Sequence, residues 1–137
     1  MLDPKTQIGM VSLKVADLPG LTRFYQDVIG LSPLSQDKER AILGAGQRPL
    51  VELIARPDGY KPENTTGMYH LALRVPGRAD LGAWLVHYSG LDGPYWQGAS
   101  DHDVSEALYL SDPEGNGIEI YADRPKSIWT FLNDGRI

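Results

Sequence analysis

The sequence predicts an α+β fold built from two tandem modules, each a strand, a helix and three further strands (βαβββ). Three observations predict it. A strand-and-helix block recurs at one offset, so that Met10 corresponds to His70 and Gly30 to Gly90, 60 residues apart in both cases. Apolar residues alternate in the expected strands and recur at helical spacing in the expected helices. Each half then closes with a strand that carries a glutamate, Glu52 and Glu119.

The first module is expected to begin with a strand over 8–15, where apolar and polar residues alternate. Asp17 follows as the N-cap of a helix, and Gly30 is the glycine expected just beyond its end. The remaining strands are expected over 32–36, 39–44 and 50–56.

The second module repeats this order. A strand is expected over 70–75, and Asp80 is the expected N-cap of a helix that ends at Gly90. The turn-forming run DPEGNG separates the last two strands. The three strands after the helix are expected over 94–98, 105–111 and 117–122.

The length of the chain predicts a single domain over 1–137. Within it we expect module one over 6–57, a polar linker over 58–66, module two over 67–124 and a C-terminal tail over 125–137.

Composition excludes several classes of function. The chain has no cysteine, which excludes disulfides, thiolate metal sites and cysteine nucleophiles. A net charge of −5 without a basic cluster argues against nucleic acid and against anionic membranes as partners. No signal core or membrane span is apparent, so a soluble cytoplasmic protein is expected.

His70 and Glu119 are the candidate metal ligands, because an imidazole and a carboxylate on two strands are what a divalent-metal site in a sheet needs. Glu119 alternates with apolar neighbours and therefore faces away from them, and Glu52 does the same in module one. Met10 stands where module one should repeat the histidine, and its soft thioether binds hard divalent ions poorly. The alternatives are a histidine that only hydrogen-bonds a neighbour and glutamates that only face solvent.

Two segments resemble the vicinal oxygen chelate superfamily, which includes glyoxalase I, bleomycin-resistance proteins and extradiol ring-cleavage dioxygenases. The first segment is the strand–helix block over 11–31, which opens VSLKVADL. The second is 101–121, DHDVSEALYLSDPEGNGIEIY, which closely resembles the end of one domain in catechol 2,3-dioxygenase-like proteins. The resemblance extends over nearly the whole chain, to about Arg124.

The resemblance implies that both modules join in one cup-shaped, eight-stranded mixed sheet with the helices outside. It places the metal-ligand positions on the first and last strand of each module, at Met10, Glu52, His70 and Glu119. We therefore expect His70, Glu119 and Glu52 to bind a divalent metal, Fe(II) or Mn(II). Absence of the metal is the alternative, because Met10 replaces a histidine.

Tyr109 and His102 are the candidate catalytic residues. Tyr109 lies ten residues before Glu119, the spacing at which ring-cleaving members of the family place a tyrosine that binds substrate. His102 could exchange protons near neutral pH. The alternatives are a tyrosine that packs in the cup and a solvated histidine in an aspartate-rich loop.

The resemblance favours an extradiol dioxygenase-like protein that acts on a small catechol or other vicinal oxygen compound at a divalent metal. A metal-dependent lyase belongs to the same hypothesis. The alternatives are a metal-free module that sequesters an aromatic or drug-like small molecule, and a non-catalytic domain with a degenerate metal site. Whether the chain is an enzyme stays open between them, and a homodimer is expected in each case.

Overall fold

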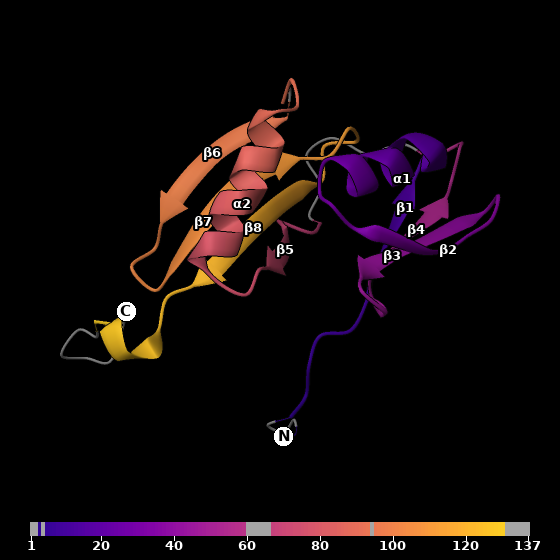
Figure 1. Cartoon of the computed structure of the whole chain (residues 1–137). Helices are drawn as coiled ribbons and strands as arrows, with labels where there is room; N and C mark the ends of the chain where they lie inside the picture. Colours follow the sequence, from indigo (N-terminus) through magenta and orange to yellow (C-terminus); the bar gives the residue numbers. More distant parts are fainter. Residues whose placement is uncertain (1–2, 4, 60–66, 94, 131–137) are drawn as a thin grey trace. The chain divides into compact units, whose positions relative to one another are not determined.

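The computed structural model describes residues 3, 5–59, 67–93 and 95–130. The chain divides into two compact units, Met1–Thr65 and Thr66–Ile137, and each is described by itself. Each unit is a βαβββ module with one helix and one four-stranded mixed sheet (Figure 1). The predicted fold class is therefore confirmed, while the joining of both sheets into one cup stays a prediction.

The first unit has the strand order β1-β4-β3-β2, in which β1 runs parallel to β4 and the other neighbours are antiparallel. The helix α1 contacts β3 and β4 and buries Leu21 and Tyr25. Asp17 caps this helix as predicted, because its Oδ1 accepts a hydrogen bond from the Gly20 N–H at 2.9 Å. The elements are β1 (Val11–Val15), α1 (Leu18–Asp27), β2 (Ser32–Gln36), β3 (Arg40–Ala45) and β4 (Arg48–Ala55).

The second unit has the matching order β5-β8-β7-β6, with β5 parallel to β8. Its helix α2 contacts β8 (Figure 1). The apolar face of the sheet buries Leu110, Ile118 and Ile120. The elements are β5 (Leu71–Arg74), α2 (Arg78–Ser89), β6 (Trp96–Asp101), β7 (Ser105–Ser111), β8 (Gly117–Asp123) and a short 3₁₀ helix (Lys126–Ile128).

The prediction that Asp80 caps the second helix is wrong. The N-cap is Gly77, whose extended backbone brings the chain into α2, and Asp80 lies in the first turn. There its negative charge still interacts favourably with the positive end of the helix dipole. Gly90 is the C-cap of α2, and Gly30 takes a positive φ of 88° just after α1, so both glycines mark helix ends as expected.

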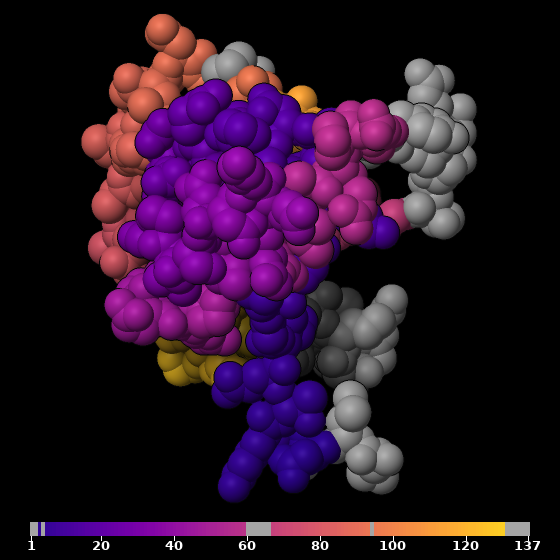
Figure 2. Space-filling model, turned by 90° about the vertical axis from the view of Figure 1, so that its right-hand side faces the viewer, coloured from indigo at the N-terminus to yellow at the C-terminus, as the bar shows by residue number. Residues whose placement is uncertain are grey.

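Some strand boundaries also differ from the prediction. Both first strands begin late, at Val11 and Leu71, so Met10 and His70 each lie directly before a strand rather than within it. Residues 5–10 form an exposed segment ahead of β1 (indigo in Figure 2). The strand expected over 94–98 is found at Trp96–Asp101, and residue 94 lies outside the described residues. Residues 60–66 of the expected linker and 131–137 of the expected tail also lie outside them.

The internal repeat is structural as well as sequential. In the first unit Ser12 of β1 pairs with Glu52 of β4, and in the second Ala72 of β5 pairs with Glu119 of β8. The two glutamates therefore occupy the same position in the two sheets. Among the described residues, no helix is long and apolar enough to cross a membrane.

Candidate functional site

A depression of about 660 Å³ opens over the second sheet, on the face that carries Tyr109 and Glu119. The chain segments that line it include Tyr69, His70 and His102. Four of the five residues predicted from the sequence therefore come together: His70, His102, Tyr109 and Glu119. The fifth, Glu52, belongs to the first unit.

Glu119 lies at the centre of this group. Its neighbours on β8, Ile118 and Ile120, are buried on the opposite face of the sheet, so the carboxylate is turned into the depression. One carboxylate oxygen, Oε1, accepts a hydrogen bond of 3.1 Å from the Tyr109 hydroxyl. The other, Oε2, lies 4.0 Å from Nδ1 of His70. The two oxygens thus have different neighbours, a phenol and an imidazole.

Tyr109 is the cross-strand partner of Glu119 in the β7–β8 ladder, which explains why their side chains meet. Burial raises the pKa of Tyr109, and the charge of Glu119 raises it further. The phenol therefore keeps its proton and donates a hydrogen bond to Glu119. His102 Nε2 lies 2.9 Å from the same hydroxyl oxygen, so this nitrogen is the donor toward Tyr109.

The loop that carries His102 is held by neighbouring groups. Asp103 takes a positive φ of 63°, and its N–H donates to Asp101 Oδ1 at 2.9 Å. Arg124 binds Asp101 at 2.6 Å and the Asp103 carbonyl at 3.2 Å. The Asp103 N–H and Arg124 hold the pKa of Asp101 below its ordinary value. The role of Arg124 could not be predicted from the sequence, because Asp103 and Asp101 lie 21 and 23 residues away from it.

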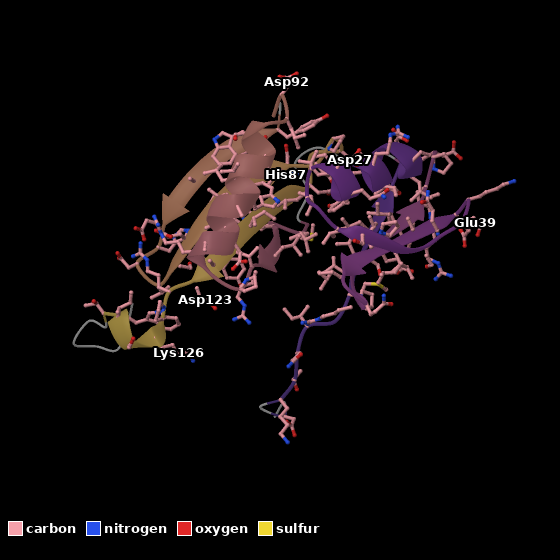
Figure 3. The ribbon with its side chains drawn as sticks, in the orientation of Figure 1. Asp27, Glu39, His87, Asp92, Asp123 and Lys126 are labelled. Carbon is pink, nitrogen blue, oxygen red and sulfur yellow. The ribbon has the colours of Figure 1, made fainter. Side chains whose placement is uncertain are left out.

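His70 approaches Glu119 from the segment that precedes β5. Its imidazole lies beside the rings of Tyr69 and Tyr109, with centroid distances of 4.3 and 5.1 Å. The third histidine, His87, lies exposed on α2 (Figure 3). It is not among the residues that line the depression. The sequence assigned it no function.

The equivalent position in the first unit is chemically different. Ser12 donates a hydrogen bond of 2.5 Å to Glu52 Oε2, and Arg40 lies 3.2 Å from Oε1. These two contacts, Ser12 first, hold the pKa of Glu52 below its ordinary value. Met10, directly before β1, is 38% exposed. The positive charge near Glu52 is thus supplied by Arg40.

The His70–Glu119 pair has the chemistry of two ligands to one divalent ion. Protein ligands lie about 2.0–2.2 Å from such an ion, and angles of about 90–110° at the ion place two of them roughly 2.8–3.6 Å apart. The 4.0 Å between Nδ1 and Oε2 is longer, so the two side chains would have to move closer together to bind one ion. Within the part of the chain that the structure describes, no group of three or more histidine, aspartate and glutamate side chains converges. Glu52 as a further ligand stays a prediction, and Arg40 already engages one of its oxygens.

Comparison with known families matches residues 7–120 to the model of the Glyoxalase/Bleomycin resistance protein/Dioxygenase superfamily. The chain belongs to this superfamily. The resemblance predicted from the sequence is therefore confirmed, and the match covers most of both modules.

Two curated relatives extend the match. A catechol-2,3-dioxygenase of Bacillus subtilis is 42% identical over 133 residues, which cover 95% of this chain and 46% of the relative. A biphenyl-2,3-diol 1,2-dioxygenase of Rhodococcus globerulus is 30% identical over 117 residues, which cover 81% of this chain and 60% of the relative. The chain thus spans only about half the length of the curated relatives that it matches.

Solved structures support the fold. A lactoylglutathione lyase from Agrobacterium tumefaciens matches with a TM-score of 0.70 at 21% identity, covering 94% of this chain and 100% of that one. A glyoxalase/dioxygenase from Nostoc punctiforme matches with a TM-score of 0.69 at 20% identity, covering 91% and 97%. At such identities the likeness concerns the fold alone.

Proposed function

We propose that this superfamily chain is an extradiol dioxygenase-like protein that acts on a small aromatic vicinal diol with a divalent metal. The observation that carries the proposal is the group of four side chains in the second unit, in which His70 and Tyr109 flank the two oxygens of Glu119. The names of the two curated relatives, a catechol and a biphenyl-2,3-diol dioxygenase, support the substrate class.

His70 and Glu119 are the proposed ligands, for Fe(II) or Mn(II). One imidazole and one carboxylate suit these ions, which accept nitrogen and oxygen donors together. When bound, such an ion supplies Lewis acidity, which lowers the pKa of the hydroxyl groups that it contacts. Glu52 would take part only if its carboxylate exchanged Arg40 for the ion, because Arg40 now provides its countercharge.

Tyr109 is proposed to bind a substrate hydroxyl by turning toward it the O–H that it now donates to Glu119 Oε1. Its raised pKa keeps the phenol protonated, so at neutral pH the hydroxyl is a hydrogen-bond donor rather than a base. His102, exposed and 2.9 Å from the same oxygen, orients the phenol and connects it to solvent. Proton exchange between Tyr109 and water can therefore pass through His102.

A metal-free binding module is the second candidate. The first unit favours it, because Met10 replaces the expected histidine and Arg40 neutralises Glu52 without a metal. The partial coverage of the curated relatives favours a related alternative, a domain whose chemistry depends on further sequence. Under either alternative the depression would bind an aromatic ligand with no metal.

Metal analysis separates these functions. The chain is purified without chelator under anaerobic conditions, loaded with Fe(II) or Mn(II) and desalted, beside Glu119→Gln and His87→Gln. We expect stoichiometric metal in the wild type and in His87→Gln, which removes a histidine outside the depression, and loss of metal in Glu119→Gln. Oxygen uptake with catechol then tests turnover. Absence of metal from the wild type, with catechol binding that survives Glu119→Gln, would instead establish the binding module.

A homodimer is also proposed, as for the fold family at large. Light scattering coupled to size-exclusion chromatography measures the molar mass directly. A mass of one 15.1 kDa chain at micromolar concentration would contradict it.

A further inference from the structure

Gly117, the first residue of β8, leaves the space that the His70 imidazole occupies. A methyl group on its Cα would lie 2.5 Å from His70 Cδ2, 3.3 Å from His70 Nε2 and 2.5 Å from the carbonyl oxygen of Tyr69. Carbon atoms in favourable contact are about 3.5–4.0 Å apart. Any side chain at residue 117 would therefore displace the imidazole and the backbone that carries it.

The conformation of Gly117 gives no other reason for a glycine. The described glycines with positive φ, where a side chain would be strained, are Gly30, Gly46, Gly98 and Gly115. Gly117 is not among them, so alanine could adopt its backbone conformation. What excludes a side chain there is the neighbouring segment Tyr69–His70.

The first unit provides an independent comparison. Glu52 and Glu119 correspond in register, and two residues before them in the sequence stand Leu50 and Gly117. The local backbone differs, because the β3–β4 register shifts at Leu50, whereas Gly117 pairs with Ser111 in the β7–β8 ladder. At the other end of the frame stand Met10 and His70. The module that has the imidazole thus has a glycine two residues before its glutamate, and the module that lacks the imidazole has a half-buried leucine there.

We propose that Gly117 is a positioning residue, whose missing side chain leaves room for the His70 imidazole beside Glu119. The imidazole is then confined by the backbone of Gly117 and by the rings of Tyr69 and Tyr109, and its Nδ1 faces Glu119. The effect of Gly117 on metal affinity rests on the proposed function, whereas its effect on the position of the imidazole is independent of metal.

The test compares Gly117→Ala with Gly67→Ala in the full chain. Gly67 precedes the same segment, and a methyl group on it would meet nothing within 4 Å. Mn(II) affinity is measured by electron paramagnetic resonance, and the ring-proton NMR signals of His70 are assigned with a His70→Ala variant among the three histidines. We expect Gly117→Ala to shift the His70 ring signals and to weaken Mn(II) binding about 10- to 100-fold, the usual effect of disturbing the support of a metal ligand. Gly67→Ala should change neither.

The two readouts separate this inference from the proposed function. Wild-type affinity for Mn(II) and unmoved His70 signals in Gly117→Ala would overturn the inference and leave the metal site standing. If the wild type binds no Mn(II), the proposed function fails, and the His70 signals alone show whether Gly117 positions the imidazole. If Gly117→Ala does not fold, the double variant His70→Ala/Gly117→Ala decides. Removing the ring should restore part of the stability, and no restoration would overturn the inference.

Discussion

Replacing Tyr109 with phenylalanine tests the centre of the site by removing one oxygen atom. The hydroxyl makes two hydrogen bonds, to Glu119 Oε1 at 3.1 Å and to His102 Nε2 at 2.9 Å. A hydrogen bond to a charged group contributes about 1.5–3 kcal/mol and a neutral one about 0.5–1.5 kcal/mol. Water in the open depression can replace the lost donor at Glu119, so we expect a total loss of about 1–2 kcal/mol. This corresponds to a decrease of roughly 0.5–1 M in the urea midpoint.

The same substitution should reduce activity by a limited factor. Because burial and Glu119 raise the pKa of Tyr109, the phenol holds its proton and contributes one hydrogen bond to the substrate. Loss of one such bond corresponds to roughly a 10- to 100-fold decrease in kcat/KM. A proton-transfer role would cost about 10²- to 10⁴-fold, mainly in kcat. Steady-state oxygen uptake with catechol measures both parameters.

Tyr121→Phe is the matched control. Tyr121 lies two residues beyond Glu119 on β8 and does not line the depression, so its hydroxyl should matter little for activity. If Tyr109→Phe keeps full activity while its stability falls as expected, the phenol has only a structural role. If kcat falls by three orders of magnitude at unchanged KM, the phenol transfers its proton in the reaction, and the assignment of Tyr109 to substrate binding alone is wrong.

Two further substitutions test the neighbouring charges. Arg40→Met removes one of the contacts that lower the pKa of Glu52, so it should destabilise the chain at neutral pH. Stability that comes from the lowered pKa is present above the ordinary carboxylate pKa and is lost as the pH falls through the folded-state pKa. The urea midpoints of wild type and variant should therefore converge in acid, and a constant gap would refute the linkage. Arg124→Met frees the loop that carries His102 and should lower kcat/KM about 10-fold. Arg74→Met breaks an exposed ion pair at the end of β8 and should leave kcat/KM unchanged. Equal effects of the two substitutions would show that Arg124 acts only through its charge.

The features that follow from short-range patterns were predictable. Alternation within 117–122 showed that Glu119 faces away from Ile118 and Ile120, and the structure confirms it. The repeat gave Glu52 the same position, and the strand registers confirm the correspondence. Asp80 was misjudged because aspartate is common both at an N-cap and in the first turn, and only the backbone of Gly77 distinguishes the two.

The cross-strand contacts were not predictable in the same way. Arg40 reaches Glu52 because it lies two residues before Ile42, the direct partner of Glu52 in the β3–β4 ladder. That relation depends on a register that alternation alone does not specify. Arg124 reaches Asp103, next to His102, across the open end of the β7–β8 hairpin. The sequence identified the residues with reactive groups and missed those that hold them.

Glu52 and Glu119 show how the same position can be put to two uses. In the first unit the donors are a hydroxyl and a guanidinium, so the carboxylate charge is compensated within the chain. In the second unit the carboxylate accepts a hydrogen bond from the uncharged Tyr109 phenol, and the His70 imidazole lies 4.0 Å away, beyond hydrogen-bond distance. No described arginine or lysine takes the place that Arg40 has beside Glu52. A cation at that position would offset the desolvation cost of the half-buried carboxylate, which water at the surface offsets only in part. The replacement of Ser12 by Ala72, and of Arg40 by a small residue at Ala107, is therefore as much a part of the proposed metal site as His70.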